Sequence, residues 1–125
     1  LGDAQDFGDA TTSAEGKPGL SSPTRGVFGG GSSPGLLDTI DYITIATLGD
    51  ATDFGNLTQS RTGLAAASST VRGLFAAGTR TAPATNSNVI DYVTIATTGN
   101  ASDFGDLSAE VTVPTGLSDS HGGLG

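Results

Sequence analysis

The chain has no cysteine, no methionine and no tryptophan. Without cysteine it forms neither a disulfide nor a thiolate nucleophile, and its redox compartment stays undetermined. No apolar run approaches the roughly 20 residues that span a bilayer, and no signal peptide is visible. Because methionine is missing and Leu1 lies within a repeat, we expect a processed piece, or the ordered part, of a longer protein.

Positive charge is also scarce. Nucleic-acid binding needs clustered lysine and arginine to replace the counterions of the phosphate backbone, and an acidic surface disfavours anionic membranes. The net charge is −8, and the five basic residues are scattered. We therefore expect no nucleic-acid partner and no membrane insertion. The basic residues are Lys17, Arg25, Arg61, Arg72 and Arg80.

What the chain does contain favours β structure. Hydrophobic residues make up 35% of it, and 20 of its 125 residues are glycine. This composition is too apolar for a disordered chain and too rich in glycine, serine and threonine for a helical one. The sequence predicts an all-β fold with many turns.

An internal repeat organises the whole sequence. Residues 41–55 return almost unchanged as 91–105, a period of 91 − 41, or about 50 residues, and the second half of this stretch also opens the chain as 1–8. Such a period is typical of repeat architectures. We expect a single repeat array over residues 1–125, made of a partial unit 1–23, unit one 24–70, unit two 71–120 and the start of a further unit 121–125.

Each unit is expected to hold four short β segments separated by turns. The connections 32–35 and 79–88 differ between the units, as exposed loops do. The segments are 24–31 with 71–78, 40–47 with 90–97, 53–58 with 103–108, and 61–69, with weaker copies at 6–11, 19–22 and 116–120.

The second segment is the strongest expected strand, since it is dense in Ile, Val, Thr and Tyr. Alternation along it predicts one face with Tyr42, Thr44 and Ala46, and another with Asp41, Ile43, Ile45 and Thr47. Both faces carry apolar groups, so we expect cover on both sides. The candidate packing residues are Tyr42, Ile43, Ile45, Phe54, Tyr92, Val93, Ile95 and Phe104.

Four short strands in about 50 residues are typical of a propeller blade. The order of Gly29–Gly31, Tyr42, Phe54 and Arg61 resembles a degenerate kelch repeat, with Phe at the position of the kelch Trp and Ala76-Ala77-Gly78 in the second unit. The Asp-Tyr-Val-Thr-Ile-Ala-Thr and Asp-Phe-Gly-Asp-Leu motifs resemble the repeats of marine and cyanobacterial phage tail-fibre-like proteins. That resemblance implies tandem four-stranded, β-propeller-like blades in a virion or extracellular structural protein.

About 2.5 units are too few to close a propeller of four to eight blades. The chain would be a fragment of a longer propeller, one of several copies that close a ring, or a unit of an open β-repeat stack or filament. We expect assembly with other copies, and the choice between ring and filament stays open.

The sequence offers little for catalysis. Asp-Phe-Gly at Asp6, Asp53 and Asp103 lacks the other motifs of a kinase, so we expect a packed Phe and a bend at Gly. His121 has no nucleophile partner, and Gly29–Gly31 lacks the residues of a phosphate loop, so we expect a close backbone approach there. We predict no enzyme activity and no cofactor.

The recurring carboxylates leave two interpretations open. Oxygen-rich loops can bind calcium, but the spacing fits no known calcium loop, and Asx turns account for the pattern more simply. Asn56 and Asn100 also match the glycosylation acceptor pattern, at different places in the repeat. The carboxylates are Asp3, Asp6, Asp9, Asp50, Asp53, Asp103 and Asp106.

The expected function is a non-enzymatic structural and adhesive module. Rigid units would present the variable loops to a host glycan or surface protein, with avidity adding weak contacts. The alternative is a self-assembling filament or sheath protein without a ligand, in which Ile43, Ile45, Val93 and Ile95 pack against another copy. The candidate recognition residues are Ser32, Ser33, Pro34, Gly35, Thr79, Arg80, Thr81, Asn86 and Asn88.

Overall fold

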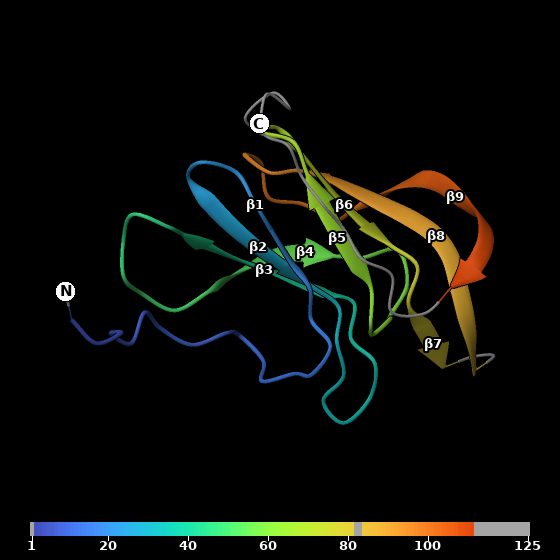
Figure 1. Ribbon diagram of the computed structural model, residues 1–125, viewed down its shortest axis with the longest axis horizontal. Coiled ribbons are helices and arrows are strands. Elements are labelled where there is room, and N and C mark those ends of the chain that lie inside the picture. Colours follow the sequence, from blue (N-terminus) through green and yellow to red (C-terminus); the bar gives the residue numbers. More distant parts are fainter. Residues whose placement is uncertain (1, 82–83, 112–125) are drawn as a thin grey trace.

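A computed structural model describes residues 2–81 and 84–111, which form two open antiparallel sheets without a helix (Figure 1). The all-β prediction is confirmed. Within the described residues, no helix is long and apolar enough to cross a membrane. The predicted segments at 116–120 and 121–125, and His121, lie outside the described residues.

The first sheet is a meander of four strands in the order β1-β2-β3-β4. The second joins β5, β6, β8 and β9, while β7 pairs with the beginning of β8. Each sheet thus combines the last segment of one sequence unit with the first three segments of the next. The strands are β1 (Gly19–Ser21), β2 (Arg25–Gly29), β3 (Thr39–Thr44), β4 (Thr52–Asn56), β5 (Ala65–Ser68), β6 (Arg72–Ala76), β7 (Thr79–Thr81), β8 (Ala84–Thr94) and β9 (Ser102–Val111).

The strongest predicted strands end earlier than expected. β3 ends at Thr44 and β8 at Thr94, whereas the prediction continued both for three more residues. In each unit a turn begins at that point, because the amide of Thr47 donates to Thr44 and that of Thr97 donates to Thr94, both over 3.1 Å. The prediction that Ile45, Ala46 and Thr47 alternate along a strand is therefore wrong.

Two further predictions needed correction. Residues 79–88 are not an irregular loop, since β7 pairs with the beginning of β8 as a hairpin, with Thr79 opposite Asn86. Threonine suits a pleated strand surface, which outweighs the turn-forming residues around it. Residues 6–11, predicted as a weak β segment, form no strand.

The Asp-Phe-Gly motif forms a bulge in each sheet. Ile40 pairs with Gly55 and Asp41 with Asp53, so Phe54 is the extra residue of β4. Gly55 has a φ of +145°, which side chains disfavour, and its amide donates to Asp53 Oδ1 over 3.0 Å. The second sheet repeats this arrangement. The predicted bend at this glycine is confirmed.

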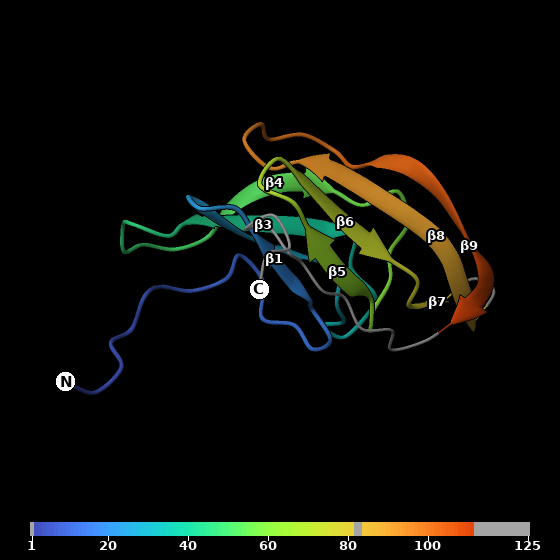
Figure 2. The same cartoon turned by 45° about the horizontal axis from the view of Figure 1, so that its top comes forward.

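The core lies between the two sheets. Figure 2 shows β1 next to β5, where the Ser68 hydroxyl donates to the Ser21 carbonyl over 2.9 Å. The ring of Phe75 packs on Gly29, and Leu20 packs on Gly73, so glycines on each sheet make room for side chains of the other. The buried cluster is Leu20, Val27, Ile40, Phe54, Leu57, Leu64, Phe75, Val93, Ile95 and Ala101.

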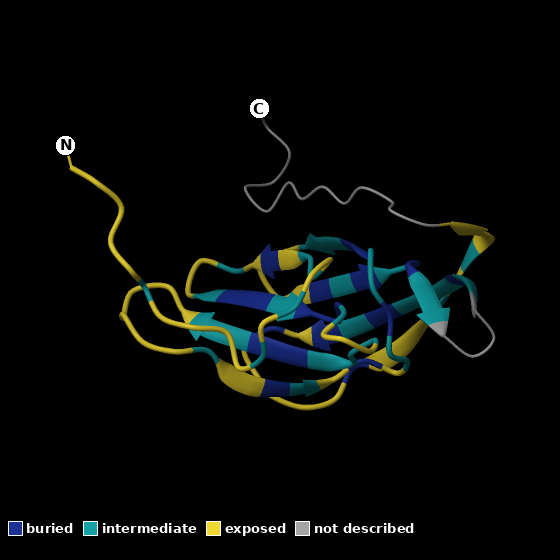
Figure 3. Cartoon of the chain, turned by 90° about the horizontal axis from the view of Figure 1, so that it is seen from below, coloured by how far each residue is buried: buried dark blue, intermediate teal, exposed yellow. Residues whose placement is uncertain are grey.

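Buried residues gather along the strands in the middle of the molecule, and the N-terminal segment is mostly exposed (Figure 3). Equivalent residues of the two units nevertheless differ in exposure. Phe54 is 3% exposed, whereas Phe104, at the same place in the motif, is 53% exposed. Ile95 is 1% exposed, whereas Ile45 is 45% exposed. Sequence does not cause this difference, since the motifs match. Each of these residues is buried where its unit meets the other unit and exposed where it does not.

Candidate functional site

The junction between the sheets contains a short backbone contact that we call the turn clasp, formed by Phe54–Asn56 and Gly99–Ala101. Gly99 N donates to Phe54 O over 2.7 Å, and Ala101 N donates to Asn56 O over 2.8 Å. The amide of Asn56 in turn donates to the Asn100 side chain over 3.1 Å. A β-carbon on Gly55 would overlap the Gly99 carbonyl oxygen, so the clasp requires glycine there.

The same clasp occurs a second time, at the other side of the first sheet. Residues 7–9 contact the turn Gly49–Ala51: Gly49 N donates to Phe7 O and Ala51 N to Asp9 O, both over 2.8 Å. The Asp9 amide donates to Asp50 Oδ1 over 3.0 Å. The N-terminal segment 6–11 therefore takes the place that β4 takes at the junction of the two sheets.

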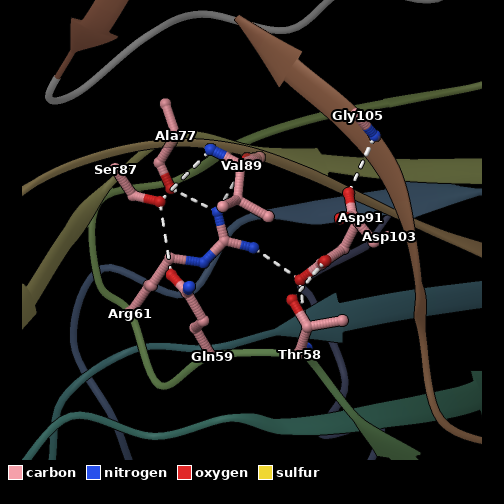
Figure 4. A network of polar contacts seen from close by, with 9 residues as sticks. All are labelled: Thr58, Gln59, Arg61, Ala77, Ser87, Val89, Asp91, Asp103 and Gly105. Carbon is pink, nitrogen blue, oxygen red and sulfur yellow. Dashed lines mark hydrogen bonds and ion pairs between the residues drawn. The ribbon is translucent and has the colours of Figure 1, made fainter.

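Close to the clasp between the sheets lies a buried ion pair (Figure 4). Arg61 Nη2 lies 2.5 Å from Asp91 Oδ2, and both side chains are fully buried. Arg61 Nη1 donates to the carbonyls of Ala77 and Val89, over 2.8 and 2.9 Å. Thr58, the second residue after β4, donates both its amide and its hydroxyl to Asp91, over 3.1 and 2.5 Å. The network thus ties one unit to the next.

Burial lowers the pKa of Arg61 below its ordinary value, and the charge and hydrogen bond of Asp91 oppose that shift. Of the buried side-chain polar atoms in the described residues, Arg61 Nε has no hydrogen-bond partner. A buried charge without a counterion is costly, so Asp91 is needed to keep Arg61 in the core. Because Asp91 is fully buried, we interpret the ion pair as a stabilising contact within the fold.

Asp41, the equivalent of Asp91, has an equivalent network. Its carboxylate accepts from the Thr11 hydroxyl over 2.5 Å and from the Lys17 ammonium group. The hydroxyl and the cation again come from residues that follow the clasp in the sequence, as Thr58 and Arg61 do at the junction of the sheets. The side chain of Asp41 is fully buried and that of Lys17 is 9% exposed, so this pair is slightly more accessible than Arg61–Asp91.

The glycines after β2 support the same junction. Gly31 N donates to Arg61 O over 2.8 Å, and Gly30 has a φ of +71°. A β-carbon on Gly30 would lie 2.6 Å from Arg61 O. The predicted close backbone approach at Gly29–Gly31 is confirmed, and its partner is the backbone of the ion-paired arginine.

Arginines at the start of β2 and β6 allow a matched test of the junction. Arg25 lies over the Tyr42 ring at 4.4 Å and also donates to Ile95 O, in the other unit, over 2.9 Å. Arg72 lies over the Tyr92 ring at 4.8 Å, and among the described residues it has no such carbonyl partner in another unit.

We expect Arg25→Leu to lower the free energy of unfolding by about 1–2 kcal/mol, because it removes a cation–π contact and a charge-assisted hydrogen bond. Arg72→Leu should cost only about 0.5 kcal/mol, since it removes the cation–π contact alone. Urea denaturation of both variants measures the difference. Equal losses would show that the bond to Ile95 contributes nothing.

The predicted recognition residues lie on equivalent connections between strands. The connection of β2 to β3 contains Ser32–Gly35, and that of β6 to β8 contains the β7 hairpin; both lie along the lower edge of the molecule in Figure 1. A cavity of about 520 Å³ adjoins the first connection, lined by Ser13, Ala14, Glu15, Ser32, Ser33 and Pro34. Thr79, Arg80 and Asn86 are half-buried on the hairpin, and Thr81 ends β7. Asn88 is half-buried further along β8.

Four of the seven recurring aspartates accept hydrogen bonds from backbone amides, in two different ways. Asp6, Asp53 and Asp103 each accept from the amide two residues later, as predicted for Asx turns. Asp50 accepts from the amide of Asp9 in the clasp at the N-terminal segment. Within residues 2–81 and 84–111, no group of three His, Asp or Glu side chains is placed to hold a metal ion.

The buried ion pairs were not predicted. Alternation placed Asp41 on a face with isoleucines, but its lysine partner lies 24 residues away in the sequence. One feature of the sequence could have indicated them: an aspartate lies within the most apolar segment of both units, and a charge there needs a buried partner.

A scan against known protein families found no match for this chain, and neither did a search of curated proteins.

Proposed function

We propose that this chain is a non-enzymatic structural and adhesive repeat module of a virion appendage, such as a tail fibre. The observation that carries the proposal is the division of each unit into an invariant and a variable part. The clasp and the buried aspartate recur with the same contacts, while the connections of β2 to β3 and of β6 to β8 differ in length and composition.

In this proposal the sheets are propeller-like blades that act as a rigid support. The junction fixes one sheet on the next through backbone bonds, an ion pair and a shared core. The variable connections then lie at equivalent places on successive units, so several weak contacts to one host surface add by avidity. The resemblance to phage tail-fibre repeats supports a location on the virion or outside the cell.

The chemistry of the first connection favours a saccharide as the ligand class. The residues that line the cavity there are three serines and Glu15, together with the apolar Ala14 and Pro34. Serine and glutamate side chains supply the hydrogen-bond donors and acceptors that sugar hydroxyls need. We therefore propose a host glycan as the ligand of this connection.

The double variant Glu15→Gln/Ser33→Ala should weaken binding to an immobilised glycan array by about tenfold, the equivalent of losing one charge-assisted hydrogen bond. Its thermal unfolding should match that of the unchanged protein, because both side chains are exposed. A variant that unfolds, or an unchanged protein that binds no glycan on the array, would contradict the proposed role of this connection.

A further inference from the structure

A third copy of the clasp motif is present but unoccupied by the described residues. Asp103 Oδ1 accepts from the Gly105 amide over 2.8 Å, as in the two engaged copies. Gly105 has a φ of +139°, close to the +143° of Gly8 and the +145° of Gly55. No described residue lies within 4 Å of the position of its β-carbon. The motif thus keeps the shape of a clasp, and no turn from residues 2–81 or 84–111 is bound to it.

The sheet face that carries this motif is less buried than its equivalent. On the first sheet, Val27, Ile40, Phe54 and Leu57 pack against the second sheet and are at most 5% exposed. Their equivalents on the second sheet are all more accessible to solvent. We call these four residues the donor face: Leu74, Ile90, Phe104 and Leu107.

The opposite end of the molecule shows the complementary difference. Phe75, Val93, Ile95 and Ala101 of the second unit are at most 9% exposed, because they pack against the first sheet. Their equivalents in the first unit are again more accessible. We call these the acceptor face: Phe28, Ile43, Ile45 and Ala51. Donor and acceptor faces are thus the two halves of a junction that the molecule already forms once internally.

The N-terminal segment covers the acceptor face incompletely. It supplies the clasp and Phe7, but it has Ala10 where β4 is followed by Leu57. A cavity of about 300 Å³ remains between the segment and the sheet, with Phe7, Ala10, Phe28 and Ile43 among its lining residues. At the internal junction, the corresponding side chains Phe75 and Val93 are buried in the core.

We propose that the acceptor face binds the donor face of a second copy of this chain, head to tail. β9 of one copy replaces residues 6–11 of the next, so that Phe104 takes the place of Phe7 and Leu107 that of Ala10. The segment 6–11 is then a competing plug. The contact is heterologous, so it propagates into a filament or closes into a ring. This proposal does not depend on what the variable connections bind.

Two complementary variants test the polarity of the contact by sedimentation velocity of the full chain. Phe104→Ser disables the donor face, and Ile43→Ser/Ile45→Ser disables the acceptor face. Each alone should weaken self-association at least about tenfold. An equimolar mixture should form one-to-one dimers and nothing longer, because one intact face of each kind remains. Val71→Ser removes an apolar side chain of 62% exposure outside both faces and is the control.

Gly8→Ala tests the plug separately. Its β-carbon would overlap the Gly49 carbonyl oxygen, so the variant releases residues 6–11 and should strengthen self-association at least about tenfold. If only Gly8→Ala self-associates, the proposal is supported, provided that adding Phe104→Ser to this variant abolishes its self-association. Monomers in both the unchanged chain and Gly8→Ala, at concentrations up to about 1 mM, would overturn it. So would dimers that neither face variant weakens, or a mixture that forms no dimer.

Discussion

Replacing Arg61 by methionine is expected to lower the free energy of unfolding by about 3–5 kcal/mol, because Asp91 then remains in the core without a counterion. Both side chains are fully buried, so solvent does not screen the loss. The variant also removes the donor to the carbonyls of Ala77 and Val89. Urea denaturation followed by circular dichroism measures the change.

Two controls separate the charge from the packing. Arg61→Met/Asp91→Asn removes both charges and should recover much of the lost stability, since replacing a buried pair is often close to neutral. Lys17→Met should cost less than Arg61→Met, because the Lys17 side chain is more accessible to water. A loss below about 1 kcal/mol in Arg61→Met would show that the pair does not hold the junction.

Substitution of equivalent glycines should have unequal effects. Gly55→Ala is expected to destabilise the protein by about 4 kcal/mol or more, because it combines backbone strain with the opening of the clasp beside Phe54. Gly105→Ala, in the same motif and with nearly the same φ, should cost only the strain, about 1–3 kcal/mol. The β-carbon overlaps the Gly99 carbonyl oxygen in the first variant and meets no described atom in the second.

The difference between the two losses of unfolding free energy measures the contribution of the clasp, because both glycines have the same motif and nearly the same backbone conformation. Thermal and urea unfolding should both rank Gly55→Ala as the less stable. Equal losses would mean that the strain of a side chain at positive φ accounts for the whole effect, and that the clasp contributes nothing. Gly105→Ala should also reduce self-association, because it blocks the donor face.

Much of the architecture could be predicted from the repeat. Repetition predicted where β2 and β6 lie, the residues rich in Ile, Val, Thr and Tyr predicted β3 and the second half of β8, and Asp-Phe-Gly predicted a bend. Strand ends were harder, because Ile45 and Thr47 have strand propensity, but a turn bonded to Thr44 prevails. Propensity is a weak guide wherever such bonds compete.

The junction could not be read from local sequence. Phe54 and Phe104 stand in nearly identical motifs, yet one is buried and the other exposed, because burial depends on whether another unit is present. Asp91 and Arg61 are 30 residues apart in the sequence, so their spacing does not predict that they form a pair. The candidate recognition residues were placed from loop variability alone, and that argument missed the hairpin at 79–86 because threonine-rich sequence also suits strands.

Amide hydrogen exchange at Gly99 and Ala101 tests the repeated junction most directly. Residues 96–100 form an exposed turn apart from their contact with β4, so slow exchange at these two amides would come from their bonds to Phe54 and Asn56. We predict protection close to that of the core strands in the unchanged chain, and its loss in Gly55→Ala. Exchange at the rate of an unstructured peptide in the unchanged chain would contradict the account, because the two sheets would then not be clasped.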